Sequence, residues 1–320
     1  MKRIAVLTSG GDCAGMNAAV RAIVRAGLAA GLEVVGIQKG FQGLIDRHYE
    51  LLNTKSVSNV LQRGGTFLQS ARCKEMRELT GQRLAAQNLS GMGVEGLIVL
   101  GGDGSLTGAL ALAQQGVAVI GIPASIDNDI PFTDMALGVD TALNNIARAV
   151  DNIKDTASSH DRAFLVETMG RNCGYLAVVS AIACGAEYSL IPEEAYDLEV
   201  ICQELRRRYQ QGRSNSIIMV AEGAGNAQKI AEEIKDKIGF ETRTIVLGHY
   251  QRGGSPTVYD RLLAARFGQA AVENLLAGEK GKMLGLENSN LLLTPLEKVI
   301  AAGIRPIDKL LPRLARNLTI

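Results

Sequence analysis

Short apolar runs alternate with helical patterns along most of this 320-residue chain. Such alternation is typical of a parallel sheet that carries helices on both faces. The apolar runs that predict strands lie at residues 4–7, 34–37, 94–100, 117–122, 163–166, 217–221 and 244–247. Helical spacing of apolar residues covers 15–28, 141–156, 198–210, 227–238 and 260–276, and two more helices are expected to end near 115 and 183. The pattern therefore predicts an α/β fold.

The pattern restarts near residue 139, so we expect a second, smaller α/β domain there. A length of 320 residues also suits about two domains. We expect the larger domain to contain residues 1–138 and about 251–300, and the smaller one residues 139–250 and about 301–320. Both are expected to be doubly wound, Rossmann-like folds with mainly parallel sheets.

Composition excludes some classes of protein. Charged residues make up 21% and nearly cancel, with 34 Lys and Arg against 33 Asp and Glu, so no overall attraction to nucleic acid is expected. Any anion must therefore be bound by local groups of arginines. Five cysteines occur without a C-x-x-C pair, which argues against a disulfide framework or a zinc site and favours a reducing compartment. We see neither a signal peptide nor an apolar run of membrane-spanning length, and we expect a cytoplasmic protein.

The first candidate site directly follows the predicted strand at 117–122. If the chain continues extended, Asp127 and Asp129 point to the same side, together with the hydroxyl of Ser125. Open parallel sheets bind ligands at the carboxyl ends of their strands. Two carboxylates there can act as a base and as a metal ligand in phosphoryl transfer. The alternative is an Asx-turn, in which Asp and Asn side chains cap their own backbone.

Two glycine-rich turns follow other predicted strands, at residues 8–12 and 101–105. Glycines let the backbone approach a phosphate closely, and the start of a helix favours negative charge. In the second turn, Asp103 offers a hard oxygen ligand for Mg²⁺, and Gly104 leaves room for a nucleotide. Neither turn has the Walker A pattern. Each also suits an ordinary strand-to-helix turn. In the second turn, Asp103 or Ser105 would then cap the helix.

Several arginines lie near predicted strand ends or glycines, and arginine binds phosphate through two hydrogen bonds. They are Arg72, Arg162, Arg171, Arg243 and Arg252. His249 can hydrogen-bond a sugar hydroxyl. Any one of these side chains, taken alone, also suits a solvated surface charge or a structural histidine. We find no Ser-His-Asp arrangement, no cluster of His and Cys suited to a metal, and no basic-aromatic patch.

Taken together, the chain resembles the ATP-dependent 6-phosphofructokinases of bacterial type, from Ile4 to about Ile300. The resemblance rests on specific segments in the family's order: TSGGDCAGMNAAVR, RGGTFLQSAR, GGDGS, SIDNDI, SSHDR, MGR and LGHYQRGGSP. It implies transfer of a phosphoryl group from MgATP to the 1-hydroxyl of fructose 6-phosphate in glycolysis. It also implies an active site in the cleft between the two domains.

The resemblance implies roles for individual residues. Asp127 is the expected base, Asp129 orients metal or phosphate, and Arg72 and Arg171 stabilise charge on the transferring phosphoryl group. Residues expected to hold ATP are Gly11, Arg72, Cys73, Gly102, Asp103, Gly104 and Ser105, with Asp103 on Mg²⁺. Residues expected to hold the sugar phosphate are Ser125, Ile126, Asp127, Met169, Gly170, Arg171, Glu222, His249, Tyr250, Gln251 and Arg252. Arg162 and Arg243 are expected to reach the 6-phosphate from a neighbouring subunit, which implies a homotetramer.

Two positions beside the predicted base depart from the family pattern. Bacterial members usually carry Gly-Thr where this chain has Ala124-Ser125. Pyrophosphate-dependent relatives usually carry Asp at the position of Gly104 and Lys at that of Ala124, so Gly104 favours ATP as the donor. The alternatives that stay open are a pyrophosphate-dependent enzyme on the same fold and a non-catalytic, regulatory relative that binds nucleotide and sugar phosphate. A NAD or lipid kinase shares the glycine-rich turn, but the MGR and GHYQRGGSP segments argue against it.

The family's effector pocket for ADP or phosphoenolpyruvate is only partly preserved. Residues that fit it are Arg21, Arg25, Lys154, Gly185, Glu187 and Arg213, with Lys154 in place of an arginine. Basic residues are common where this chain has Thr54, Gln211 and Ser214. Because three cationic partners of a polyanion are missing, we expect activation by ADP to be weak or altered.

Overall fold

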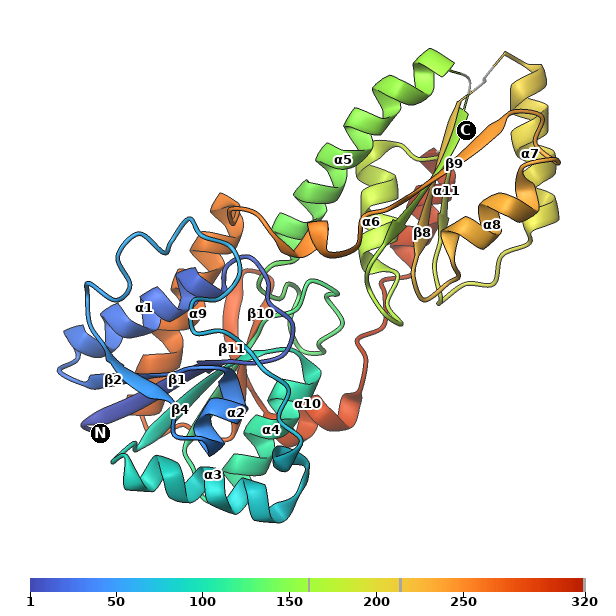
Figure 1. The fold of residues 1–320 in the computed structure, drawn as a ribbon. Helices are drawn as coiled ribbons and strands as arrows, with labels where there is room; N and C mark the ends of the chain where they lie inside the picture. Colours follow the sequence, from blue (N-terminus) through green and yellow to red (C-terminus); the bar gives the residue numbers. More distant parts are fainter. Residues whose placement is uncertain (161, 213–214, 319–320) are drawn as a thin grey trace. The chain divides into compact units, whose positions relative to one another are not determined.

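The computed structural model describes residues 1–160, 162–212 and 215–318. The chain divides into two compact units, which Figure 1 shows with their elements labelled. The first unit consists of Met1–Ile126, Ile130–Thr141 and Arg252–Arg305. The second consists of Asp127–Asp129, Ala142–Gln251 and Pro306–Ile320. The chain thus passes from one unit to the other inside the predicted acidic site.

The described part of the first unit contains a seven-stranded sheet in the order β11-β10-β5-β4-β1-β2-β3. The five strands from β10 to β2 pair in parallel, whereas β3 and β11 pair antiparallel at the two edges. The strands are β1 (Arg3–Thr8), β2 (Glu33–Ile37), β3 (Tyr49–Leu52), β4 (Gly96–Gly101), β5 (Val119–Pro123), β10 (Lys282–Glu287) and β11 (Asn290–Pro295). Every residue of β4 is buried, as expected of a central strand that is covered on both faces.

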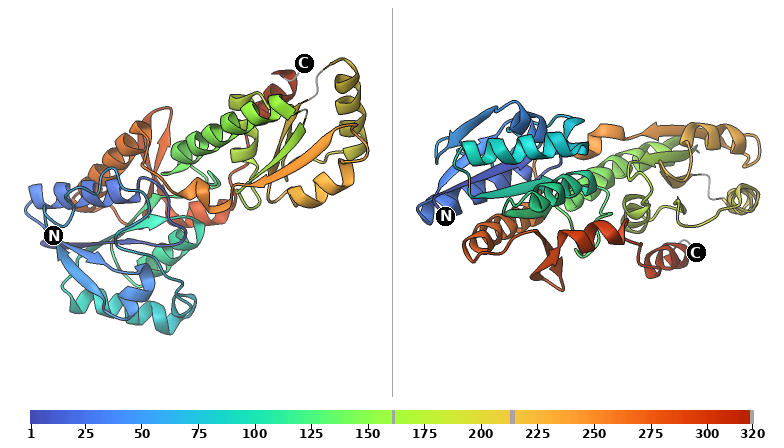
Figure 2. Two further views of the ribbon diagram at one scale, coloured as in Figure 1. Left: turned by 45° about the horizontal axis from the view of Figure 1, so that its top comes forward. Right: turned by 90° about the horizontal axis from the view of Figure 1, so that it is seen from below.

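Helices cover both faces of this sheet, as the two views of Figure 2 show. Helices α1 and α9 pack side by side on one face, and α2, α3, α4 and α10 form a packed layer on the other. Their bounds are α1 (Met16–Ala29), α2 (Gly40–Ile45), η1 (Glu75–Arg77), α3 (Leu79–Gly91), α4 (Asp103–Gln114), α9 (Val258–Leu276) and α10 (Leu296–Ala302). This layering is that of a doubly wound α/β fold.

The described part of the second unit contains a four-stranded parallel sheet in the order β7-β8-β6-β9. Helix α5 (Val139–His160) begins in the first unit and continues into the second. The other elements are β6 (Arg162–Thr168), α6 (Tyr175–Cys184), β7 (Tyr188–Leu190), α7 (Leu198–Gln210), β8 (Ser216–Ala221), α8 (Ala227–Ile234), β9 (Glu241–Val246), η2 (Gly248–Arg252) and α11 (Leu310–Leu318). Apolar side chains of α7 and α8 pack on β6 and β8 in one core, while α11 packs against α6.

The predicted elements are present, with shifted ends. The helix at 198–210 has the expected bounds, but the helix expected to run to residue 238 ends at Ile234. Ile238 is nevertheless fully buried in the same core, which explains why the apolar pattern continues beyond the helix. None of the helices in the described part of the chain is long and apolar enough to span a membrane.

Candidate active site

The topology places two glycine-rich turns next to each other in the first unit. Strand β1 lies between β2 and β4. The chain therefore places β2 on one side of β1 and later places β4 on the other side. This reversal of strand order is where open parallel sheets bind ligands. The Ser9 amide donates to Leu100 O at 2.9 Å, and a Cβ on Gly10 would lie 3.2 Å from Ser105 Oγ. The turns at 8–12 and 101–105 therefore touch, although they are about 90 residues apart in sequence.

Packing requires glycine at one position of the second turn but not at another. A Cβ on Gly101 would overlap Ser105 and the Ser9 carbonyl, so packing requires glycine there. A Cβ on Gly104 would meet no atom within 4 Å, and the backbone of Gly104 is not left-handed. Because nothing in the protein itself requires glycine at 104, the space above it is open to a ligand. Gly102 lies beside Ser125, whose Cβ would be 3.9 Å from a Cβ on Gly102.

Asp103 is the first residue of α4, and its side chain is exposed. A helix start favours anions such as phosphate. No group of three or more His, Cys, Asp or Glu side chains that could hold a metal ion is present among the described residues. Magnesium in nucleotide enzymes is usually held by one or two carboxylates and by the substrate's phosphates. One exposed carboxylate at a helix start that favours phosphate therefore fits Mg²⁺ that would be shared with a nucleotide.

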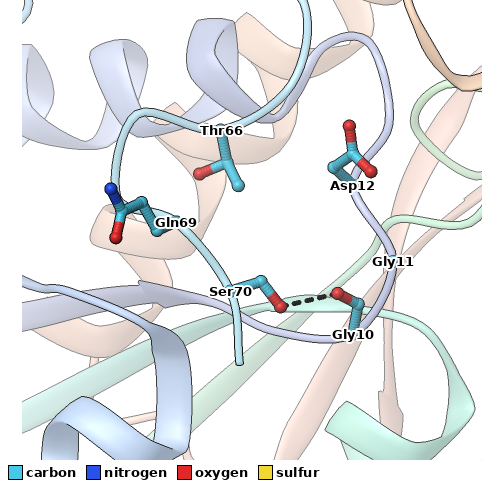
Figure 3. A pocket seen from close by; sticks show the side chains of 6 residues that line it. All are labelled: Gly10, Gly11, Asp12, Thr66, Gln69 and Ser70. Atoms are coloured by element: carbon cyan, nitrogen blue, oxygen red, sulfur yellow. Dashed lines mark hydrogen bonds between the residues drawn. The ribbon is translucent and has the colours of Figure 1, made fainter. Parts of the chain in front are cut away.

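A pocket of about 330 Å³ opens beside the first turn and is shown in Figure 3. It lies between the turn carrying Gly11 and the loop that leads to Arg72, and it is lined by Gly10, Gly11, Asp12, Thr66, Gln69 and Ser70. Ser70 Oγ donates to Gly10 O at 2.6 Å and so ties the loop to the turn. A Cβ on Gly11 would overlap the guanidinium of Arg252, which donates to Asp12 O at 3.0 Å.

The acidic stretch does not continue extended beyond β5, which corrects the geometry we expected. Residues 126–127 form a turn, and Asn128 has a left-handed φ of 52°. An Asn side chain tolerates that conformation better than most. Asp127 is only 2% exposed, and its Oδ2 lies 3.6 Å from Arg171 Nε in an ion pair. A buried carboxylate beside a cation is thus formed by a turn, not by alternation along a strand.

The thiol of Cys173 indicates where the other acids lie. The pKa of Cys173 is raised to about 11, chiefly by burial and in smaller part by the negative charges of Glu193, Asp129 and Asp127. Asp127 and Asp129 are therefore both close enough to this thiol to act on it. The charges of both predicted carboxylates therefore act on the same buried thiol.

The loop that carries Arg171 is held by carboxylates of the second unit. Glu222 Oε1 accepts hydrogen bonds from the backbone amides of Gly170, at 3.2 Å, and Arg171, at 2.8 Å. Glu193 accepts a hydrogen bond from the Gly174 amide at 2.9 Å. Arg171 has a left-handed φ of 52° and a side chain that is 68% exposed. The loop is therefore fixed through its backbone while the guanidinium remains accessible.

The other residues predicted to hold the sugar phosphate lie near this loop or in the segment after β9. Gln251 is 1% exposed and accepts a hydrogen bond from the Met169 amide at 3.3 Å. Its own amide donates to Gly248 O at 3.0 Å, so Gln251 joins the two segments. The side chains of His249 and Tyr250 are exposed.

Arg162 and Arg243 meet at one carboxylate in the second unit. Arg162 Nε donates to Glu241 Oε2 at 2.6 Å, and Arg243 pairs with the other oxygen of Glu241. The Arg162 guanidinium, together with that of Arg243, holds the pKa of Glu241 below its usual range. We predicted that these two guanidinium groups bind a phosphate. In the structure, both contact the Glu241 carboxylate instead.

The predicted effector residues fall in both units. Arg21 and Arg25 lie one turn apart on α1 in the first unit. In the second unit, Lys154 Nζ donates to the carbonyls of Cys184 and Gly185, and Glu187 accepts from the Ile217 amide at 2.6 Å. Arg213 and Ser214 lie outside the described residues.

A family model for phosphofructokinase matches residues 3–275 of the chain. The chain belongs to the phosphofructokinase family. The ATP-dependent 6-phosphofructokinases of Natranaerobius thermophilus and Thermotoga neapolitana are each 48% identical to it over 320 residues, with 100% of both chains covered. The crystal structure of Pichia pastoris phosphofructokinase matches 94% of the chain with a TM-score of 0.89 and 37% identity, although the match covers only 35% of that longer chain.

Membership of the phosphofructokinase family confirms the resemblance seen in the sequence, and the two mainly parallel sheets confirm the expected fold class. Sequence reasoning did not single out Glu193, although Pro192-Glu193 follows a predicted βα unit. Asn17 was noted only as part of the segment TSGGDCAGMNAAVR. Nothing local in the sequence indicates which distant backbone groups these two side chains bind.

Proposed function

We propose that this protein transfers the γ-phosphoryl group of ATP to the 1-hydroxyl of fructose 6-phosphate, giving fructose 1,6-bisphosphate and ADP. The observation that carries the proposal is the 48% identity to ATP-dependent 6-phosphofructokinases, which extends over the full length of this chain and of each relative. The protein is accordingly a kinase of glycolysis. The open space above Gly104 supports ATP as the donor, because an Asp side chain there would crowd and repel a nucleotide phosphate.

We assign nucleotide binding to the first unit. Gly11 and Gly102 present backbone to the phosphates, and α4 starts at Asp103, where its N-terminus favours their charge. Ser105, Arg72 and Cys73 complete the proposed ATP set. Asp103 is the residue that would hold Mg²⁺, which supplies charge neutralisation on the phosphates when bound.

We assign the acceptor chemistry to residues 125–129, 169–171, 222 and 249–252. Asp127 takes the proton of the attacking hydroxyl, and the neighbouring Arg171 stabilises negative charge on the transferring phosphoryl group. Asp129 orients phosphate or metal, and Ser125 and Ile126 bind the sugar as the chain approaches Asp127. The sugar phosphate is held by Met169, Gly170, Glu222, His249, Tyr250, Gln251 and Arg252. Asp127 is 2% exposed, so the proposed base is largely shielded from solvent.

We further propose a homotetramer in the cytoplasm, in which Arg162 and Arg243 of one subunit bind the 6-phosphate in the site of another. Binding requires these arginines to exchange the Glu241 carboxylate for the phosphate. ADP or phosphoenolpyruvate is the proposed effector class, with Arg21, Arg25, Lys154, Gly185, Glu187 and Arg213 as its partners.

A comparison of phosphoryl donors tests the proposal. Purified protein is assayed for fructose 1,6-bisphosphate with fructose 6-phosphate and either MgATP or magnesium pyrophosphate. We expect turnover with ATP to exceed turnover with pyrophosphate by at least a hundredfold. Equal or greater turnover with pyrophosphate would overturn the donor assignment, and no product with either donor would favour a regulatory relative.

A further inference from the structure

The side chain of Asn17 is committed entirely to a loop that carries no helix or strand. Asn17 lies on α1 and is 2% exposed. Its Nδ2 donates to Arg63 O at 3.1 Å and to Gly64 O at 3.0 Å, and its Oδ1 accepts from the Phe67 amide at 2.8 Å. Both donor hydrogens of the amide are therefore used on the loop, and so is its oxygen.

Thr8, the last residue of β1, holds the same loop farther along. Its Oγ1 donates to Gln69 O at 3.0 Å and lies 2.8 Å from Thr66 Oγ1. Because a hydroxyl has one hydrogen and Thr8 gives it to Gln69, Thr66 donates the second bond. Residues 53–74 contain no helix or strand. These side-chain hydrogen bonds therefore hold the loop in place of the backbone hydrogen bonds of a helix or sheet.

The loop held by Asn17 and Thr8 connects two other parts of the proposed site. Gly64 packs so closely on Gly254 that a Cβ on Gly64 would overlap the Gly254 carbonyl. Arg252, two residues earlier, donates to Asp12 O at 3.0 Å. The turn with Gly11 and the segments 63–73 and 252–254 thus form one connected block. Arg72 lies two residues after the last attachment, at Ser70.

We infer that Asn17 and Thr8 are positioning residues for phosphoryl transfer, which hold the 63–73 loop so that Arg72 meets the transferring phosphoryl group. Both side chains are buried, and their hydrogen bonds go to the loop. The inference rests on the proposed function. Phosphoryl transfer depends on the placement of positive charge, so a small displacement of Arg72 lowers the rate more than it lowers binding.

Asn17→Asp is the direct test, because it keeps the size of the side chain and removes both donor hydrogens. Asn88→Asp is the matched control. Asn88 is 8% exposed and also donates from Nδ2 to two carbonyls, those of Leu44 and Ile45, each at 3.0 Å. We expect kcat of Asn17→Asp to fall at least tenfold with the KM for ATP changed less than threefold. Asn88→Asp should keep both constants within twofold of the unmodified protein.

A double-mutant cycle shows whether Asn17 acts through Arg72. In an Arg72→Ala background, Asn17→Asp should lower kcat less than threefold. A full tenfold loss in that background would overturn the inference, as would a folded Asn17→Asp variant with kcat within twofold of the unmodified protein.

Thr8→Val, which removes the hydroxyl at nearly constant shape, decides by the same criteria if Asn17→Asp does not fold. Failure of both variants to fold contradicts the inference, because the contacts are then purely structural. Circular dichroism and urea unfolding establish which variants are folded. Inactivity of the unmodified protein with ATP and fructose 6-phosphate would refute the proposed function itself, whereas an active protein with unaffected variants refutes only the positioning role.

Discussion

At the scale of single residues, hydrogen-bond satisfaction separates two equally buried threonines. Thr8 is 0% exposed and its hydroxyl makes two hydrogen bonds. Thr168, the last residue of β6, is 1% exposed, and its hydroxyl has no hydrogen-bond partner within the described residues. A buried polar group without a partner is destabilising, whereas a satisfied one contributes modestly to stability.

Thr168→Val should therefore raise the free energy of unfolding by about 1 kcal/mol, and Thr8→Val should lower it by about 1 kcal/mol. The substitution is chemically identical, so the pair isolates the environment of the hydroxyl. Urea unfolding followed by circular dichroism measures both changes. A loss of stability in Thr168→Val would mean that the hydroxyl has a partner, such as an ordered water.

Gly104 offers a second residue-scale test, of ligand space. Because a Cβ at 104 meets nothing within 4 Å and φ is ordinary, Gly104→Ala should fold with unchanged or slightly greater stability. If a nucleotide fills that space, the KM for ATP should nevertheless rise at least about tenfold through steric conflict. The KM for fructose 6-phosphate serves as the internal control. An unchanged KM for ATP would remove Gly104 from the nucleotide site.

At the scale of elements, one buried carboxylate fixes the start of α5 to α9 in the first unit. Asp260 is 0% exposed, and its Oδ1 accepts from the Gly138 amide at 2.9 Å. Its Oδ2 accepts from the amide of Thr141 at 2.9 Å and from the Thr141 hydroxyl at 2.5 Å. Burial raises the pKa of Asp260 in spite of these hydrogen bonds.

Asp260→Ala should lower the free energy of unfolding by about 3 kcal/mol, because three donors lose their acceptor. The pH dependence has a definite sign. A folded-state pKa above the unfolded value means that protonation favours the folded state, so the stability contributed by Asp260 is greatest below about pH 4 and declines as pH rises through the folded pKa. The loss caused by Asp260→Ala should therefore be larger at acid pH than at neutral pH. Equal losses across that range, measured by urea unfolding, would contradict this origin.

Strong periodicity explains which elements could be predicted from the sequence. Helix α7 has a wide apolar stripe and a capping Asp197, and its bounds were predicted correctly. Strand β9 was expected at 244–247 but begins at Glu241, because an edge strand with polar and partly exposed residues lacks the apolar signal. The β10–β11 hairpin and the short α2 were not predicted, since neither has a length or pattern that distinguishes it from a loop.

The candidate site divides in the same way. Its glycine-rich turns and acids could be found because they follow buried strands, whose carboxyl ends meet at one edge of a sheet. The turn at Asn128 could not be derived, because a left-handed φ at one residue leaves little trace in the apolar pattern. The bonds from Asn17 to Arg63 and Gly64 also escape sequence reasoning, since they join residues 46 and 47 positions apart.

At the scale of the whole molecule, we expect regulation by ADP or phosphoenolpyruvate to be weak. Lys154 donates to the carbonyls of Cys184 and Gly185, so its ammonium is already engaged. Thr54 and Gln211 are neutral, and each charge-assisted contact that an effector phosphate lacks removes roughly 1.5–3 kcal/mol.

Activation by ADP should therefore be weak, less than about threefold at saturating ADP, when measured at a fructose 6-phosphate concentration below KM. Thr54→Arg and Gln211→Arg together restore two cations and should increase the response. A dose-response of activity against ADP and phosphoenolpyruvate provides the measurement. Strong activation of the unmodified protein would show that other groups bind the effector.

We propose that Asp127 acts as the base in phosphoryl transfer to fructose 6-phosphate, and the variant Asp127→Asn tests this role. The substitution keeps the shape of a side chain that is 2% exposed and removes its ability to take a proton. Asp236→Asn, at an exposed acid of the same unit, is the control. We expect kcat to fall about 10²–10⁴-fold with MgATP affinity changed less than about threefold, and we expect no change in the control. A folded Asp127→Asn protein that retains kcat within tenfold of the unmodified protein would contradict this role.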